Sequence, residues 1–481
     1  MSKLIVGPFN RVEGDLEVKL DIAGGQVEQA WVNCTLYRGF EQMLRGKRPE
    51  DALIYVPRIC GICSVSQSVA SAKALAELAG ASAPRNGQLA TNLILGCENI
   101  TDHLTHFYLF FMPDFARQSY ADNAWFGDVE SRFKAVKGTG SRDFLPARAA
   151  FLHMMGILAG KWPHSLAIQP GGVSKPVQSQ ERLQLISMIQ GLRRFLEQVA
   201  FGDRLESVSE LDSADALMRW AQDHRDSDFG RFLMLGDRLR LDQLGQGGDR
   251  FMSYGNYPLD GAPLYRSGVW HAGQIMALDN QQILEDVSHS WMAPSPQPLA
   301  PLDGETLPDL SNPDGYSWCK APRLNGHTVE VGALARQLID RQPLAQSLVA
   351  EAGANVYSRE VMRLLEAART LLAMESWARQ LQPGEPFYQP VEIPDHGIGV
   401  GMIEAARGSL GHWLQVKDGR IHNYQIIAPT TWNFSPRDQQ QQPGPLEQAL
   451  QGTPVVTGET DPVSVQHVVR SFDPCMVCTV H

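Results

Sequence analysis

Four cysteines stand in two pairs near opposite ends of the chain, and their spacing suits metal binding. Cys60 and Cys63 form the first pair, in RICGIC, and Cys475 and Cys478 form the second, in DPCMVCTVH. Two residues between cysteines allow both sulfurs to turn toward one point, which is why metal sites use this spacing. Four thiolates make a soft donor set that suits zinc, nickel, copper(I) or iron–sulfur chemistry. The pattern therefore predicts a metal site built from thiolates.

Spacing alone leaves other uses of these cysteines open. A structural zinc site with four cysteine ligands is common, although a local structural site does not need the more than 400 residues between Cys63 and Cys475. A thioredoxin-like redox pair would need a nearby βαβ pattern, which neither pair has. The other cysteines, Cys34, Cys97 and Cys319, stand singly and are expected to be small buried hydrophobic residues. No second set of four remains for an iron–sulfur cluster, so such clusters would lie in a partner chain.

The two cysteine motifs resemble those of the large subunit of nickel–iron hydrogenases. Segments similar to other blocks of that family stand in order between them: RVEGD (11–15), RGFE (38–41), DHLTHFY (102–108), PGGV (170–173), YSWCKAPR (316–323), EAARGSLGHW (404–413) and APTTWNFSPRD (428–438). The likeness runs from residue 7 to residue 481. It implies a single large domain over 1–481, in which the N- and C-terminal segments build the metal site together.

The resemblance implies a nickel–iron centre that is held by sulfur. The nickel ligands would be Cys60, Cys63, Cys475 and Cys478. Cys63 and Cys478 would also bind an iron that carries cyanide and carbon monoxide ligands, which maturation proteins supply. The implied activity is reversible heterolytic cleavage of H2 into a hydride and a proton. The implied partner is a small iron–sulfur subunit, in a heterodimer or a dimer of heterodimers.

Further site residues follow from the same resemblance. Glu13 in RVEGD matches the glutamate that first accepts the proton from a cysteine sulfur. Arg407 matches a guanidinium over the open side of the site that hydrogen-bonds a cyanide, and Thr430 matches a hydroxyl donor to a cyanide. Asp102 and Asp473 match carboxylates that position the arginine and the hydrogen bonds of the site.

The terminal histidine has an implied role as well. In the family a C-terminal extension is removed after this residue once nickel is bound, and the freed segment folds inward with the last two cysteines. By resemblance, His481, Glu41 and the backbone carbonyl of Ile426 would hold a magnesium ion that is otherwise coordinated by oxygen and water. We expect the chain either to be processed at this residue or to be encoded without the extension.

Three positions depart from most catalytic members and resemble the regulatory, hydrogen-sensing branch of the family. Ile62 stands where valine is usual, Phe110 where leucine is usual and Gln67 where histidine is usual. Asp102, His106 and Phe110 are four residues apart, so on a helix Phe110 would face the metal site. Ile62 and Phe110 are large and would narrow a gas route, admitting H2 while slowing O2. A compensated exchange of core side chains is the alternative interpretation.

The branch resemblance sets the expected role. Gln67 cannot titrate or carry charge, so the role of the usual histidine is in doubt, and Ala406 replaces a proline beside Arg407. Members of the branch are slow, cytoplasmic, oxygen-tolerant sensors that report H2 to a histidine kinase, which becomes a further expected partner. The alternative within the family is an energy-conserving uptake hydrogenase. From another class, a non-catalytic structural subunit with a four-cysteine zinc site is the alternative.

Helical periodicity dominates the sequence that must position these motifs. Apolar spacing predicts helices over 69–78, 88–112, 180–200 and 358–381, and the second is apolar on most faces, as a buried central helix would be. Alternation around AGGQ predicts an N-terminal hairpin over 15–33. Proline and glycine predict loops at 293–315, 383–398 and 435–445. The sequence thus predicts a mainly α, multihelical α+β fold with a central buried helix bundle and small peripheral β elements.

Composition limits the partners and the location. The 42 basic and 53 acidic side chains give a formal net charge of −11, which argues against binding nucleic acid or an anionic membrane. No apolar run approaches the roughly 20 residues of a membrane span, so direct membrane insertion is not expected. The start, MSKLIVGPFNRVEGD, lacks the pattern of a secretory signal. Seven cysteines, an odd number, do not suggest a disulfide framework, and we expect a cytoplasmic location.

Overall fold

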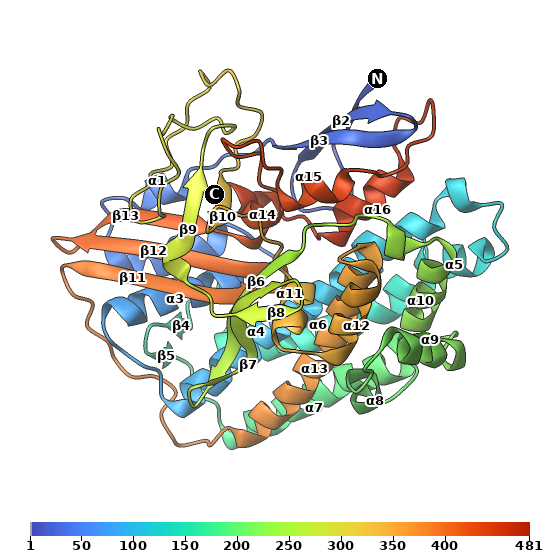
Figure 1. Cartoon of the computed structure of the whole chain (residues 1–481). Helices are drawn as coiled ribbons and strands as arrows, with labels where there is room; N and C mark the ends of the chain where they lie inside the picture. The colour runs from blue at the N-terminus through green and yellow to red at the C-terminus, as the bar shows by residue number, and fades with distance from the viewer. Residues whose placement is uncertain (1) are drawn as a thin grey trace.

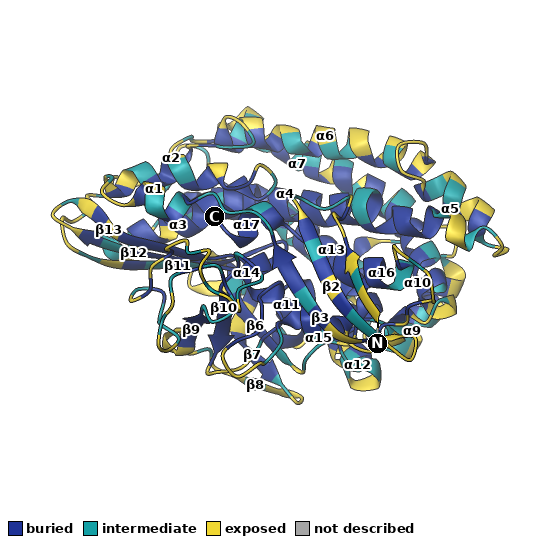
Figure 2. Ribbon diagram, turned by 90° about the horizontal axis from the view of Figure 1, so that it is seen from above, coloured by how far each residue is buried: buried dark blue, intermediate teal, exposed yellow. Residues whose placement is uncertain are grey.

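Two long helices form the centre of the molecule in the computed structural model, which describes residues 2–481 (Figure 1). α4 (Arg85–Thr105) packs along α13 (Val356–Gln380), and most side chains of both are buried. α6 (Thr139–Ala159) packs on α4, and α7 (Ser179–Phe195) packs on α13. Figure 2 shows that α6 exposes its outer face, whereas α4 lies in the buried interior. The prediction of a mainly α fold around a buried helix bundle is confirmed.

Shorter helices surround this centre. They are α1 (Phe40–Leu44), α2 (Ala52–Tyr55), α3 (Ser64–Leu78), α5 (Phe126–Phe133), α8 (Leu205–Ser209), α9 (Ala214–Asp223), α10 (Asp228–Arg238), α11 (Ala333–Ile339), α12 (Pro343–Ala352), α14 (Pro429–Asn433), α15 (Pro445–Leu450), α16 (Val463–Ser471) and α17 (Met476–Thr479). The helices predicted at 69–78, 180–200 and 358–381 are present as α3, α7 with the π-helical turn that follows it, and α13. Within residues 2–481, none of these helices has a stretch long and apolar enough to cross a membrane.

The helix predicted over 88–112 is present, but its last turn is wider than an α-helix. After α4 the chain continues as a π-helix, His106–Phe111, and then as a 3₁₀ turn, Met112–Ala116. Pro113 has no N–H and interrupts the regular ladder of hydrogen bonds. π-helical turns inside helices are frequent at functional sites. This one begins one turn after Asp102.

Within the described residues, the strands form five antiparallel sheets. These are β1 (Ser2–Val6), β2 (Leu16–Ala23) and β3 (Gln26–Cys34); β4 (Ile168–Gln169) and β5 (Gly172–Val173); β6 (Arg250–Leu259), β7 (Ala262–His271) and β8 (Gln274–Met276); β9 (Ile283–Asp286) and β10 (Ala321–Leu324); and β11 (Gly397–Ala405), β12 (Gly408–Lys417) and β13 (Arg420–Ile427). The predicted N-terminal hairpin is confirmed as β2 and β3. No helix or strand lies within 293–315, whereas the other two predicted loops overlap the starts of β11 and α15.

The sheet of β11, β12 and β13 lies directly against α3 (Figure 1). Gly399 and Gly401 of β11 make this approach possible, because a Cβ atom at either position would come within about 2 Å of a backbone oxygen of α3, that of Ala74 or Ala70. A side chain at these positions would therefore push the helix away. The sheet and α3 form one unit, and α3 begins immediately after Cys63.

Candidate metal centre

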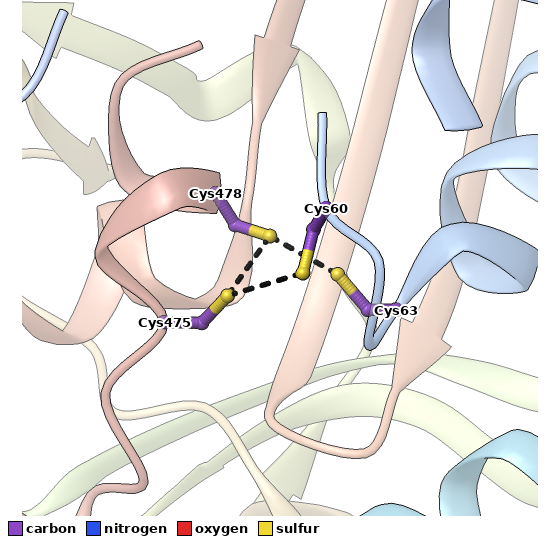
Figure 3. Close-up of side chains that lie close together, drawn as sticks. All are labelled: Cys60, Cys63, Cys475 and Cys478. Carbon is purple, nitrogen blue, oxygen red and sulfur yellow. Dashed lines mark hydrogen bonds between the residues drawn. The ribbon is translucent and has the colours of Figure 1, made fainter. Parts of the chain in front are cut away.

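The four paired cysteines meet at one point (Figure 3). The Sγ atoms of Cys60 and Cys475 lie 3.6 Å apart, and those of Cys63 and Cys478 lie 3.0 Å apart. All four side chains are buried, and their sulfurs lie within 4.8 Å of one another. Within residues 2–481 this is the one group of three or more His, Cys, Asp or Glu side chains with the geometry to hold a metal ion. Both ends of the chain thus build a single thiolate site.

Backbone pairing holds the C-terminal cysteines against the N-terminal segment. Glu13 pairs with Cys475 in a short parallel bridge, and the N–H of Met476 donates to the carbonyl oxygen of Glu13 at 2.7 Å. Cys475 precedes α17 and Cys478 lies within it. On the other side, Cys63 is the residue that opens α3. The segment that leads into α3 and the short helix α17 therefore present the two pairs of sulfurs to each other.

Arg38 joins the two cysteine segments directly. Its guanidinium donates to the carbonyl oxygen of Ile59 at 2.5 Å and to that of Val477. Ile59 comes just before Cys60, and Val477 comes just before Cys478, so one side chain fixes the backbone beside a cysteine of each pair. Arg38 lies in the RGFE motif but was not among the predicted site residues. Its place in RGFE was the available signal.

The donor set fits a nickel–iron centre. Thiolates are soft, electron-rich ligands for nickel and iron, and four buried sulfurs this close together repel unless cations or protons neutralise them. A four-thiolate zinc site would use the same donors. The remaining cysteines are buried thiols outside this group, which leaves no set of four for an iron–sulfur cluster among residues 2–481.

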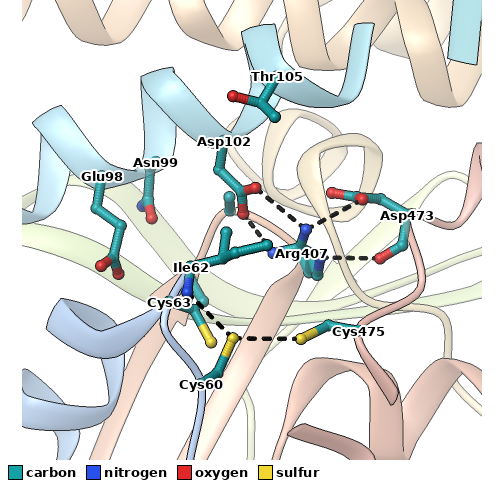
Figure 4. Close-up of polar contacts among 12 residues, drawn as sticks. Cys60, Ile62, Cys63, Glu98, Asn99, Asp102, Thr105, Arg407, Asp473 and Cys475 are labelled. Atoms are coloured by element: carbon teal, nitrogen blue, oxygen red, sulfur yellow. Dashed lines mark hydrogen bonds and ion pairs between the residues drawn. The ribbon is translucent and has the colours of Figure 1, made fainter. Parts of the chain in front are cut away.

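Arg407 lies between the cysteines and two carboxylates (Figure 4). It occupies the two-residue turn between β11 and β12, and only 5% of it is exposed. Its Nε donates to the carbonyl oxygen of Asp473 at 2.9 Å, and its Nη2 reaches the carboxylate of that residue at 3.2 Å. Both terminal nitrogens donate to the carboxylate of Asp102, Nη2 at 3.1 Å. The structure therefore brings Arg407, Asp102 and Asp473 together at the cysteines.

The two carboxylates differ in their electrostatic surroundings. Burial raises the pKa of Asp102 to about 7 against the attraction of Arg407. Although burial also opposes the charge of Asp473, Arg407 holds the pKa of this residue below its usual value. Asp473 adopts a φ of 51°, which is uncommon for a residue other than glycine. Its Oδ2 has no hydrogen-bond partner among the described residues, so one buried acceptor remains for a ligand or water.

Glu13 and Thr430 also lie at the cysteines. Burial and the nearby Cys60 thiolate raise the pKa of Glu13, which is half-buried. The hydroxyl oxygen of Thr430 accepts from the N–H of Cys475 at 3.3 Å. That bond leaves the hydroxyl hydrogen for another acceptor. Both residues therefore lie near the sulfurs, and their roles stay predictions.

The terminal histidine folds inward. Its Nε2 lies 2.8 Å from the carbonyl oxygen of Ile426 and 3.4 Å from a carboxylate oxygen of Glu41. Although burial opposes its charge, Lys320 and His481 hold the pKa of Glu41 below its usual value. An imidazole, a carboxylate and a carbonyl oxygen converge here, and the two oxygens are the donors that magnesium prefers. The predicted residues meet, and the ion itself stays a proposal.

The three unusual positions fall in different surroundings. Ile62 donates its N–H to the Cys60 sulfur at 3.3 Å, and its side chain points toward Asp102 and Arg407 in Figure 4. Phe110 is only partly buried, and its carbonyl oxygen accepts from Arg11. Its role in gas access stays a prediction.

Gln67 is buried and is part of a hydrogen-bond chain rather than facing solvent. Its Oε1 lies 2.8 Å from Nε2 of His412, and Nδ1 of His412 lies 2.8 Å from the hydroxyl of Tyr424. Burial lowers the pKa of His412 to about 3, so this imidazole is neutral at ordinary pH. These hydrogen bonds link α3 to β12 and β13 through uncharged groups.

Comparisons with known proteins agree with this geometry. The nickel-dependent hydrogenase family matches residues 38–128 and 142–481. The chain is 30% identical to the periplasmic NiFeSe hydrogenase large subunit of Desulfomicrobium baculatum, over 100% of this chain and 95% of that protein. It is 28% identical to the uptake hydrogenase large subunit of Cupriavidus necator, over 100% and 95% of the two. A solved structure of the H2-activated D. baculatum NiFeSe hydrogenase aligns over the whole of both chains, with a TM-score of 0.86 and 30% identity.

These relatives correct the expected location and establish the family. The predicted cytoplasmic location is wrong by this comparison, because the D. baculatum relative is a periplasmic protein. The lack of a secretory pattern in the given sequence was therefore weak evidence for that location. The family match covers most of the sequence, and the four cysteines of the buried thiolate site all lie within the matched ranges. The chain therefore belongs to the nickel-dependent hydrogenase family, as a large subunit.

Proposed function

We propose that the chain is the H2-oxidising large subunit of an uptake hydrogenase. The observation that carries the proposal is the meeting of four buried cysteine sulfurs, from both ends of the chain, beside a buried arginine. The likeness to the NiFeSe and uptake large subunits supports oxidation of H2 over a sensing role. In this proposal Cys60, Cys63, Cys475 and Cys478 bind nickel. Cys63 and Cys478 also bind an iron with cyanide and carbon monoxide ligands.

The metals, when bound, supply a site at which H2 is cleaved heterolytically. The protein's own residues hold the geometry and move the proton. Arg407, fixed by Asp102 and Asp473, donates a hydrogen bond toward a cyanide, and Thr430 donates toward another. Glu13 takes the proton from a cysteine sulfur, and its raised pKa brings the protonated form closer to working pH.

Electrons leave through a second chain. Large subunits of nickel-dependent hydrogenases pair with a small iron–sulfur subunit, and the described part of this chain has no four cysteines left for a cluster of its own. His481, Glu41 and the carbonyl oxygen of Ile426 would bind magnesium and hold the last residues in place. In that position the ion would act on structure rather than on H2.

Metal analysis and infrared spectroscopy of the purified heterodimer test the proposal. We expect nickel together with iron, with iron in excess because the clusters of the small subunit also contain it. We also expect bands in the cyanide and carbonyl stretching region, and H2-dependent reduction of an artificial electron acceptor. Zinc without nickel, and no such bands, would contradict the proposal and restore the structural subunit with a four-cysteine zinc site.

A hydrogen sensor is the second candidate, and the position of Ile62 favours it. This side chain stands between the two cysteines of the first pair and points toward Arg407, where added bulk would narrow access for gas. A sensor would add a histidine kinase to the partners. Turnover measured before and after exposure to oxygen separates the two roles. Slow but undiminished activity favours the sensor, whereas fast turnover coupled to quinone reduction favours the uptake enzyme.

A further inference from the structure

Helix α3 begins at a metal-binding cysteine and lacks an ordinary cap. Cys63 is its N-cap residue, and the Cys63 side chain makes no capping hydrogen bond. Where a side chain caps a helix, a Ser, Thr, Asp or Asn at that position accepts from the N–H of the second or third helical residue. Here the Cys63 sulfur is 3.0 Å from that of Cys478, in the candidate metal centre. The N–H groups of Val65 and Ser66 therefore need an acceptor from elsewhere.

Glu98, on α4, supplies that acceptor. Its Oε2 accepts from the N–H of Val65 and its Oε1 from the N–H of Ser66, both at 2.8 Å. The Ser66 hydroxyl donates to Oε1 at 2.8 Å, and the indole N–H of Trp162 donates to Oε2 at 3.1 Å. Four donors thus occupy both oxygens of a carboxylate that is 1% exposed. Such a set matches an acceptor-only group, the ionised carboxylate.

We infer that Glu98 is a positioning residue for the metal centre, because it caps α3 in place of Cys63 and leaves that sulfur free to bind metal. The identity of the metal rests on the proposed function, whereas the capping does not. Asp102 lies one turn further along the same helix and holds Arg407. Figure 4 shows Glu98 and Asp102 on the side of α4 that faces the cysteines. One helix therefore sets the distance between the first cysteine pair and the arginine.

A glutamine at this position cannot replace the carboxylate. Its side chain has one acceptor oxygen, and its NH2 group would face donors where the second oxygen now accepts. The Glu98→Gln variant keeps the size of the side chain and removes half of the cap. We expect amide hydrogen exchange at Val65 and Ser66, measured by mass spectrometry, to become about tenfold faster. The weakened cap should also loosen the start of α3, where Cys63 would bind both metals. In the heterodimer, nickel content should therefore fall and the cyanide and carbonyl bands should shift.

Glu447 offers a matched control. It is also fully buried, and it accepts from the N–H of Val32 at 3.0 Å and from the hydroxyl of Tyr316 at 2.8 Å. Its donors lie outside the cysteine segments. The Glu447→Gln variant should lose stability to a similar degree, yet leave exchange at residues 64–68, nickel content and infrared bands unchanged.

Each result decides the inference. Unchanged exchange at Val65 and Ser66 in Glu98→Gln overturns the cap, and faster exchange with unchanged nickel and bands overturns the positioning role. If the variant does not accumulate as folded protein, Ser66→Ala removes one of the four donors and should give a smaller rise in exchange at Val65; no rise overturns the inference. Zinc without nickel in the unaltered protein would contradict the proposed function. The exchange measurement would still show whether Glu98 caps α3.

Discussion

At the scale of the residue, Arg407 is the side chain on which the polar contacts of the site converge. It makes hydrogen bonds to Asp102 and Asp473 from all three of its nitrogens, and it does so beside the cysteines. A planar guanidinium can satisfy two carboxylates and a carbonyl oxygen at once, whereas an ammonium is a point charge on a flexible stem. The contacts around Arg407 therefore require the planar, three-nitrogen guanidinium and not only its positive charge.

Replacing this arginine with lysine should therefore lower activity without dismantling the centre. In Arg407→Lys we expect H2 oxidation to fall about 100-fold, the loss that follows removal of one preorganised donor at a reacting centre. Nickel content should stay unchanged. Arg323→Lys is the control, because Arg323 is also buried and bonded to a carboxylate, that of Asp438 at 2.8 Å. Equal loss of activity in both variants would show a general effect of burying lysine.

Glu13 permits a separate test of proton transfer. Glu13→Gln removes the titrating group while keeping its size, so exchange of H2 with solvent deuterons should fall by at least about 100-fold, as for loss of a general acid–base group. The cyanide and carbonyl bands should remain, since the metal ligands are intact. Glu17→Gln, four residues along, changes the same kind of side chain where it bonds Asn33. Normal activity in Glu13→Gln would refute the assigned role.

At the scale of the element, the sequence predicted helices better than sheets for a physical reason. The helix that became α4 has apolar residues on most faces, which only a buried helix shows. β12 is buried on both faces, so GSLGHWLQVK lacks the alternation that marks a half-exposed strand. The glycines of β11 that let α3 approach look like loop residues in sequence. The turn that carries Arg407 was thus found through its motif, and its strands were not.

Some site residues could be predicted from the sequence and others could not. Residues inside distinctive motifs, such as the cysteines and Arg407, could be placed from sequence because the motif fixes their neighbours. Glu98 could not, since a capping carboxylate from another helix leaves no local pattern at either helix. A glutamate in a buried helical stretch, one turn before Asp102, was the only signal.

Asp114 joins the turn after α4 to α16 and to the N-terminal segment. It is fully buried in the turn after α4, where it accepts from Arg470 of α16 at 2.6 Å and from Arg11 near the N-terminus. Although burial opposes its charge, Arg470 and Arg11 lower the pKa of Asp114 from 3.8 to about 2. Because this pKa is lower in the folded state, the stabilisation is present above about pH 4 and is lost as pH falls toward 2. The shift corresponds to about 2 kcal/mol.

The Asp114→Asn variant should lack this contribution. At pH 7 we expect its free energy of unfolding to be lower by at least about 2 kcal/mol, and we expect the gap to the unaltered protein to narrow as pH falls from 5 to 3. Urea unfolding at several pH values measures both quantities. Asp461→Asn removes an exposed partner of Arg117 and should cost less than about 1 kcal/mol. A gap that stays constant with pH would contradict the sign of the shift.

At the scale of the whole molecule, the fold brings together two chain ends that are far apart in sequence. Several contacts hold the last nine residues, among them the pairing of Glu13 with Cys475, the Arg38 hydrogen bond to Val477, the Arg407 bonds to Asp473, and the contact of the terminal histidine with Ile426. None of these contacts neutralises four clustered sulfurs. In the proposed function the metal ions neutralise these sulfurs and attract both chain ends, so metal binding and the closure of the fold would be coupled.

This coupling has a measurable consequence for protein made without nickel and iron. We expect its melting temperature to be lower by on the order of 10 °C, because metal–thiolate binding contributes roughly 10 kcal/mol and a chain of this size unfolds with an entropy near 1 kcal/mol per degree. Amide exchange should become faster in residues 473–481, which the metals would hold, and stay unchanged in α13, which packs on α4 at the centre. Equal exchange in the C-terminal segment with and without metal would mean that protein contacts alone close the chain, and that the metals enter a site already formed.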